Sequence, residues 1–116
     1  VAKDEVEAAK WLRKAAEQGF DEAQHCLGIV LMNGEGVAKD EVDAAKWYRK
    51  AAKQGFAKSQ YNLGVMLAHG KGEAKNQAEA VKWFRNAAEQ GGAGAQFALS
   101  MVLMHGQGVA KDKTEA

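Results

Sequence analysis

Apolar residues lie along the first part of the chain at helical spacing. Ala8, Trp11 and Ala15 recur at intervals of three or four positions, which places them on one face of a helix. Acidic residues come early in this segment and basic residues later, as suits the dipole of a helix. Gly19 stands where a glycine with positive φ ends many helices. A second apolar line through Leu27 and Leu31 predicts another helix over residues 22–33.

This pair of helices recurs along the chain at a spacing of 36 residues, as Trp11, Trp47 and Trp83 show. Other residues that recur in register are the N-cap candidates Asp4, Asp40 and Asn76, the glycines Gly19, Gly55 and Gly91, and the leucines Leu27, Leu63 and Leu99. Stacked helix pairs bury their apolar faces against their neighbours and form a solenoid. The sequence therefore predicts an all-α solenoid of antiparallel helix hairpins with a 36-residue period.

We name the first helix of the pattern helix B and the second helix A. The predicted single domain over residues 1–116 contains a lone helix B (1–19), repeats over 20–55 and 56–91, and a third helix A with the start of a further helix B (92–116). The chain begins without Met and stops in mid-pattern, so we expect it to be a segment of a longer array.

Glycines interrupt the pattern of the A helices at two kinds of position. Gly28 and Gly64 lie inside these helices, where glycine costs about 1 kcal/mol relative to alanine. We expect a neighbouring backbone to come close there. The segment 92–94, Gly-Ala-Gly, replaces Phe-Ala-Lys of 56–58, so we expect the third helix A to begin late or to fray.

One long motif resembles a known family. From Ala23 the chain reads Ala-Gln-x-x-Leu-Gly-x-x-Leu-x-x-Gly-x-Gly-Val-x-x-Asp, and from Ala44 it reads Ala-x-x-Trp-x-Arg-x-Ala-Ala-x-Gln-Gly. Both strings, and their copies over essentially the whole chain, resemble the Sel1-like repeat (SLR) family, which is related to tetratricopeptide repeats. The resemblance implies a right-handed α/α superhelix that assembles other proteins into complexes. Many members are bacterial and act in envelope, secretion or host-contact processes.

The chain departs from the family in several places. Ala2, Ala38, Ala74 and Ala110 stand where proline is frequent, and Leu31, Leu67 and Leu103 stand where tyrosine is common. The resemblance to the disulfide-rich branch is excluded because the chain has a single cysteine, Cys26.

Charge and composition narrow the function. Sixteen basic and fifteen acidic residues give a net charge of +1, which lacks the basic excess of nucleic-acid-binding proteins. No apolar run approaches the roughly 18 residues that a membrane span requires, and no signal-peptide pattern is present. We therefore expect neither a nucleic-acid partner nor membrane insertion, and the compartment stays open between bacterial cytoplasm and envelope.

Residues capable of catalysis or metal binding do not converge in the sequence. His25 and Cys26 are adjacent, so on a helix they point about 100° apart and cannot chelate one ion. His69 and His105 occupy equivalent positions on helices on the order of 10 Å apart, whereas zinc ligands lie about 2 Å from the metal. Neither serine stands in a catalytic motif. We expect no catalytic residue, no metal and no cofactor.

The positions of helix A that vary between repeats are the candidates for partner binding. In the superhelix that the resemblance implies, helix A lines the concave side, and its packing leucines recur while other positions vary. Aromatic, Met and His side chains suit an adaptable groove for a peptide, although some could instead contact neighbouring A helices. The candidate residues are Glu22, His25, Ile29, Met32, Asn33, Lys58, Tyr61, Val65, His69, Phe97, Met101, Met104 and His105.

Three functions therefore remain as alternatives. The first is a scaffold that binds a partner segment in the concave groove, and the second is a structural spacer. The third is a hydrolase-type enzyme, for which the sequence offers no convergent catalytic residues.

The recurring tryptophans are predicted to be core residues. At the ends, we expect parts of Val6, Ala9 and Trp11 to be bare and Leu99 and Leu103 to be under-covered. These two surfaces are complementary, which predicts head-to-tail self-association.

Overall fold

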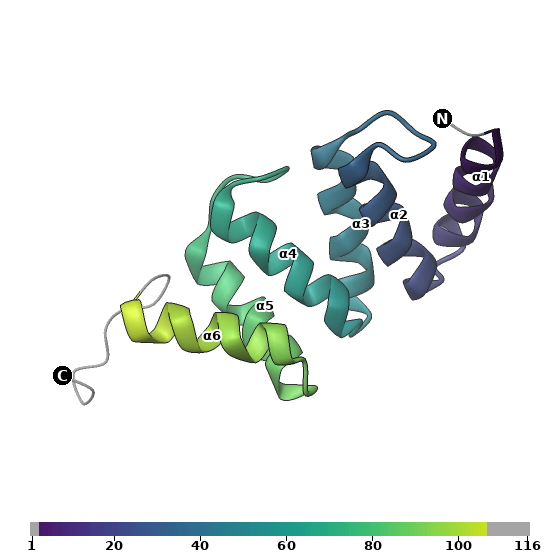
Figure 1. Ribbon diagram of the computed structural model, residues 1–116. Helices are drawn as coiled ribbons and strands as arrows, with labels where there is room; N and C mark the ends of the chain where they lie inside the picture. The colour runs from purple at the N-terminus through teal and green to yellow at the C-terminus, as the bar shows by residue number, and fades with distance from the viewer. Residues whose placement is uncertain (1–2, 107–116) are drawn as a thin grey trace.

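The computed structural model describes residues 3–106 and consists of six helices, with no strand in that range. The helices are α1 (Lys3–Glu17), α2 (Asp21–Asn33), α3 (Glu41–Lys53), α4 (Ala57–His69), α5 (Gln77–Glu89) and α6 (Ala93–His105). They form an elongated stack of 56 × 23 × 19 Å, with α1 and α6 at opposite ends (Figure 1). The further helix B predicted for the end of the chain falls on residues 107–116, outside the described residues.

The B helices begin at the predicted caps in two repeats. The side chains of Asp40 and Asn76 accept a hydrogen bond at 3.0 Å from the backbone N–H of Asp43 and Glu79 respectively. The exception is α1, which already begins at Lys3 and so has Asp4 inside its first turn. The predicted N-cap at Asp4 is therefore wrong.

The A helices begin after an extended residue, and the third begins no later than the others. Phe20, Phe56 and Gly92 precede them with nearly equal backbone angles, φ from −70° to −73° and ψ from 106° to 114°. The carbonyl of Gly92 accepts the first helical hydrogen bond from Gln96 N–H at 2.9 Å. The expected late start of α6 is therefore wrong, because backbone geometry at residue 92 suffices to begin the helix.

Each interior glycine of an A helix receives an aromatic ring of the following B helix. A Cβ at Gly28 would lie 2.6 Å from the Tyr48 ring, and one at Gly64 would lie 2.6 Å from the Phe84 ring. Tyr48 and Phe84 are buried in consequence. The close approach that the sequence predicted is thus real, but a side chain and not a backbone makes it.

Glutamines connect successive repeats through their amide groups. The side chain of Gln24 donates to the Ala16 carbonyl at 3.1 Å and accepts from Gln54 Nε2 at 2.6 Å. One repeat later, Gln90 Nε2 donates to the side-chain oxygen of Gln60 at 2.8 Å in the same way. Gln24 and Gln60 are buried, so these bonds satisfy amides that would otherwise be costly to bury.

The loop glycines fix the contact between a loop and the preceding B helix. Gly36 and Gly72 have φ values of 74° and 72°, which favour glycine. A Cβ at either position would overlap a backbone carbonyl oxygen, that of Glu5 or Glu41. Each loop therefore packs directly on the start of a B helix one repeat earlier.

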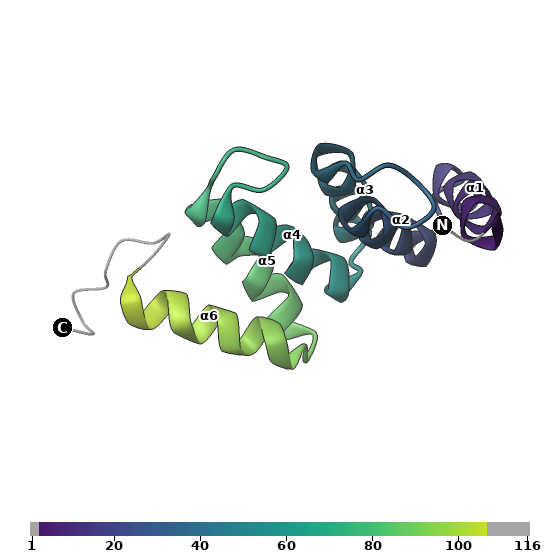
Figure 2. The same cartoon turned by 45° about the horizontal axis from the view of Figure 1, so that its top comes forward.

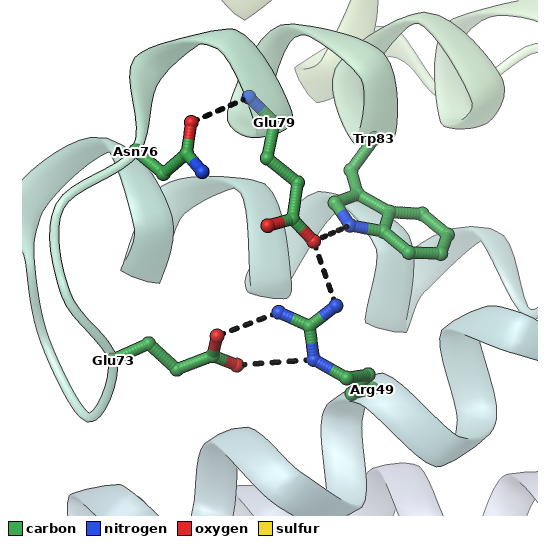
Figure 3. Close-up of polar contacts among 5 residues, drawn as sticks. All are labelled: Arg49, Glu73, Asn76, Glu79 and Trp83. Carbon is green, nitrogen blue, oxygen red and sulfur yellow. Dashed lines mark hydrogen bonds and ion pairs between the residues drawn. The ribbon is translucent and has the colours of Figure 1, made fainter.

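Arg49 on α3 joins its repeat to the loop between α4 and α5 and to α5 itself. Arg49 Nη2 donates to Glu73 Oε1 at 2.6 Å, and its Nη1 donates to Glu79 Oε2 at 2.7 Å (Figure 3). Trp83 Nε1 donates to the same oxygen of Glu79 at 3.1 Å. The Arg49 guanidinium lowers the pKa of Glu79, chiefly through the hydrogen bond that Arg49 donates to the Glu79 carboxylate.

The equivalent junction one repeat earlier, between α1 and α3, lacks most of these contacts. Arg13 reaches Asp43 only at 3.6 Å, and Val37 occupies the position of Glu73. Trp47 is 8% exposed, and its buried Nε1 has no hydrogen-bond partner among the described residues. Asp43 is one methylene shorter than Glu79, the residue that satisfies the equivalent indole.

The ends of the stack are less covered than its middle. Trp11 is 62% exposed and Val6 41%, whereas Trp47 is 8% exposed and Trp83 half-buried. The prediction of a core tryptophan is therefore wrong for Trp11. The expectation of bare residues fails for Ala9, which is 5% exposed because it faces the inside of the stack.

At the other end, Leu99 and Leu103 are half-buried, while the equivalent Leu27, Leu31, Leu63 and Leu67 are buried. Among the described residues no helix follows α6, so these leucines are under-covered as expected.

We predict that Asp43→Glu stabilises the chain. The longer side chain gives the Trp47 indole an acceptor, and an unsatisfied buried donor costs about 1–3 kcal/mol. We expect a gain of about 1 kcal/mol in the free energy of unfolding, measured by urea denaturation. The reciprocal variant Glu79→Asp is the matched control and should be destabilised. Equal stability of the Asp43→Glu and unaltered proteins would contradict the explanation.

Candidate partner-binding groove

The A helices α2, α4 and α6 follow one another along one side of the stack, and the B helices follow along the other (Figures 1 and 2). Contacts between equivalent helices agree with this arrangement. His25 on α2 contacts Ser59 on α4, and Arg49 on α3 contacts Glu79 on α5. Side chains of the A helices therefore meet across the junctions between repeats.

The first hollow on this side, which we name the α2–α4 hollow, has a volume of about 310 Å³. Five predicted groove residues line it: Ile29, Met32, Asn33, Tyr61 and Val65. Tyr48, Asn62 and Met66 complete the lining. The structure thus brings residues from two successive repeats together in one apolar depression.

The second hollow, the α4–α6 hollow, has a volume of about 270 Å³. The predicted residues His25, Lys58 and Tyr61 line it, together with residues of α5 and of the start of α6. Tyr61 and Asn62 belong to both hollows. The two depressions therefore meet at α4 and form one continuous surface, which we call the groove.

Six predicted residues line neither hollow: Glu22, His69, Phe97, Met101, Met104 and His105. Phe97 and Met104 are among the most exposed large apolar side chains, at 68% and 71%. They extend the apolar surface along α6 without a depression beside them.

The aromatic series His25, Tyr61 and Phe97 does not form an open ladder. His25 is 7% exposed, Tyr61 is half-buried and Phe97 is 68% exposed. The reason is coverage by the next repeat: His25 Nδ1 lies 2.7 Å from Ser59 Oγ, and its ring packs 5.1 Å from the Phe56 ring. His25 therefore serves mainly as a packing residue of the junction between α2 and α4.

Sequence reasoning missed several residues of the groove. Tyr48 was hidden because it lies on a B helix, and Ala95 because it belongs to the recurring apolar line. Gly92 gave a signal, since it breaks the repeat, but we expected it only to delay or fray the start of a helix. Gly94 stands at the position of Glu22 and Lys58, which the sequence predicted for the groove. The actual effect of Gly92 and Gly94 is to remove side chains from the α4–α6 hollow.

The described residues contain no arrangement for metal chemistry. No group of three or more His, Cys, Asp or Glu side chains within residues 3–106 could hold a metal ion. Cys26 is exposed and free. In the same part of the chain, no helix combines the length and apolarity that a membrane crossing needs.

The helices and their junctions define the class of the protein, an all-α solenoid of stacked helix pairs. The Sel1 repeat family model matches residues 1–20, 21–56, 57–92 and 93–116, and the chain belongs to this family. Sel1 repeat proteins are generally protein-interaction scaffolds, typically without enzymatic activity. No curated protein sequence matches the chain.

Solved structures of the same fold support the assignment. A protective antigen of uropathogenic Escherichia coli strains, c5321, displays an SLR fold and is 46% identical, with a TM-score of 0.91 over 97% of this chain and 24% of that one. A Sel1 repeat protein from Oxalobacter formigenes is 38% identical, with a TM-score of 0.80 over 93% and 50%. Helicobacter pylori cysteine rich protein B is 32% identical, with a TM-score of 0.77 over 85% and 73%. The chain thus spans about a quarter of the first relative and half of the second.

We predict that acidification weakens the junction at His25. Burial, and secondly the nearby charge of Lys58, lower the pKa of His25 below 6.5. The unfolded chain therefore takes up a proton before the folded chain does, and stability falls as pH drops below about 6.5. His25→Tyr, which copies the equivalent Tyr61, removes this titration.

The free energy of unfolding, measured with urea at about pH 7.5 and about pH 5.5, should fall more for the unaltered chain than for His25→Tyr. Acidic residues and the exposed His69 and His105 are common to both proteins and cancel in the comparison. An equal fall in both would show that His25 does not contribute.

Proposed function

We propose that the chain is a protein-interaction scaffold that holds a segment of a partner protein in the groove formed by α2, α4 and α6. The observation that carries the proposal is the meeting of two hollows at Tyr61 and Asn62. Their walls are mostly carbon, and Asn62 and Lys58 add polar groups at the surface. A depression of this kind supplies apolar contact area together with a few hydrogen-bonding groups that orient a ligand.

Helical packing explains why such a surface suits an extended segment. The groove crosses a junction between repeats, so a bound segment would contact α2, α4 and the start of α6 in turn. The backbone amides of these helices are hydrogen-bonded within the helices, which leaves recognition to side chains. Residues of this surface vary between repeats, whereas the packing residues recur. A surface made of variable positions can be specific for one partner although the framework repeats.

We predict that Tyr61→Ala weakens peptide binding at least tenfold, because truncation of a central aromatic residue removes one of the main contacts of an interface. Peptides selected from a random displayed library against the unaltered chain serve as ligands, and binding is measured by calorimetry. Phe97→Ala should cause a smaller loss, because Phe97 lies on α6 outside the hollows.

The matched control is Trp11→Ala, which truncates an exposed aromatic residue on α1, away from the groove. Its affinity should be unchanged, and circular dichroism should show equal helicity in all variants. If selected peptides bind Tyr61→Ala as tightly as the unaltered chain, the groove is not the binding surface. If the chain enriches no peptide, it acts as a spacer.

A second candidate function is head-to-tail self-association. Trp11 on α1 is 62% exposed, whereas the equivalent Trp47 inside the stack is 8% exposed. Leu99 and Leu103 of α6 are half-buried, whereas the equivalent Leu27 and Leu31 are buried in the same core cluster as Trp47. The α6 helix of one copy could therefore cover α1 of another in the way that α2 covers α3.

Light scattering over a range of concentrations tests this candidate. The mean mass should rise with concentration without a fixed limit, because a heterologous contact produces open stacks. Trp11→Lys should hold the chain at the monomer mass. A monomer at every concentration in the unaltered chain would exclude the candidate.

A further inference from the structure

One of the two junctions between A helices lacks an aromatic side chain that the other has. Phe56 precedes α4, and its ring covers His25 with the ring centroids 5.1 Å apart. One repeat later Gly92 stands in the place of Phe56, and Tyr61 stands in the place of His25. The backbone is nearly the same at both positions, with φ and ψ of −73° and 106° at Phe56 and −70° and 113° at Gly92. Only the side chain is missing.

The α4–α6 hollow lies at the place of the missing ring, because both Gly92 and Tyr61 line it. Gly94 widens it further, since it replaces Lys58 of the preceding repeat. The volume of about 270 Å³ exceeds the roughly 150 Å³ of an apolar cavity that binds benzene. An aromatic side chain therefore fits the space that Phe56 fills at the other junction.

The charge around the hollow favours an anionic group beside that ring. None of the described residues that line it is acidic, and Lys58 lies exposed at its edge. Lys58 forms no ion pair with another described residue, unlike Arg49 and Lys39. A carboxylate next to the bound ring would meet this ammonium group, at a modest gain because the site is solvated.

We propose that the α4–α6 hollow is a pocket for an aromatic side chain of a partner polypeptide that carries a carboxylate next to it. The ring packs on Tyr61 as Phe56 packs on His25, and the carboxylate pairs with Lys58. This inference rests on the groove function proposed above and gives the partner of that groove a chemistry. The described part of the chain fills the equivalent position itself at one junction and leaves it open at the next.

Titration of the isotope-labelled chain with N-acetyl-phenylalanine, followed by amide chemical shifts, tests the pocket. This probe carries both the ring and a carboxylate. We expect saturable shifts at Tyr61, Gly92 and Gly94 at millimolar concentrations. The ring without the charge, N-acetyl-phenylalanine amide, should bind about two- to fivefold more weakly, in line with an exposed ion pair. The charge without the ring, N-acetyl-alanine, should cause no saturable shift there.

Two variants separate the ring from the charge. Gly92→Phe restores the side chain of the other junction and should abolish the response to N-acetyl-phenylalanine. The variant should fold, because Phe56 already occupies nearly the same backbone geometry, and the N–H groups of Phe56 and Gly92 donate to equivalent carbonyls at 3.2 Å. A Cβ at Gly92 would make a tight contact of 3.3 Å with the Ala87 carbonyl oxygen, which requires a shift of a few tenths of an ångström. Lys58→Gln should keep ring binding and remove the difference between acid and amide.

Unchanged binding of N-acetyl-phenylalanine to a folded Gly92→Phe variant would overturn the pocket, and so would equal shifts with N-acetyl-alanine. Phe20 is 57% exposed and precedes two acids, Asp21 and Glu22, so a second copy could supply the same chemistry. Shifts at Gly92 that grow with protein concentration alone and vanish in Phe20→Ala would assign the pocket to self-association, against the proposal.

The outcome also separates this pocket from the groove as a whole. If library-selected peptides require Tyr61 but contain no aromatic-acid pair and bind Gly92→Phe unchanged, the pocket assignment fails while the groove function stands. If no peptide binds the unaltered chain, the groove function itself fails.

Discussion

The contact of an aromatic ring with a helical glycine sets the geometry on which the stack depends. The rings of Tyr48 and Phe84 lie only 2.6 Å from where a Cβ on Gly28 or Gly64 would stand, so helix A and the following helix B approach more closely than a side chain at the glycine would allow. Glycine weakens a helix by about 1 kcal/mol, and burial of a large ring offsets that cost. The buried leucines Leu27 and Leu63 pack in the same cores. The same packing of helix A on the following helix B appears in both repeats because the pair of helical glycine and aromatic ring recurs.

Polar contacts give the stack its register without being its main source of stability. The buried amides of Gln24 and Gln60 each donate to a carbonyl of the preceding B helix and accept from a glutamine at the end of their own repeat, so a slip between repeats would leave them unsatisfied. The Arg49 cluster adds a second connection, but only at one junction (Figure 3). At the other junction the Trp47 indole N–H has no acceptor among the described residues, so two junctions of the same plan differ in their polar contacts.

The groove arises where the repeats differ. At the junction of α2 with α4, Phe56 and Ser59 cover His25, and burial, with the nearby charge of Lys58, lowers the pKa of that imidazole. At the junction of α4 with α6, Gly92 and Ala95 occupy the same positions, and Tyr61 stays half-buried beside a hollow. The framework and the shape of the groove are therefore set by different residues of this chain: recurring residues hold the helices, and substitutions at a few junction positions shape the surface.

The sequence by itself determined the helices, their order and the family, because helical periodicity, N-caps such as Asp40 and glycines such as Gly55 act over a few neighbouring residues. It also placed Ile29, Met32, Tyr61 and Val65 on a common side, where the structure finds them around one hollow. Only the tertiary structure decided which variable positions are open. The exposure of His25 depends on Phe56 and Ser59, more than thirty positions away, and that of Trp11 follows from its place at the less covered end of the stack. The solvent exposure of a side chain is set by the residues that pack around it. Its position within the repeat is therefore not enough to predict that exposure.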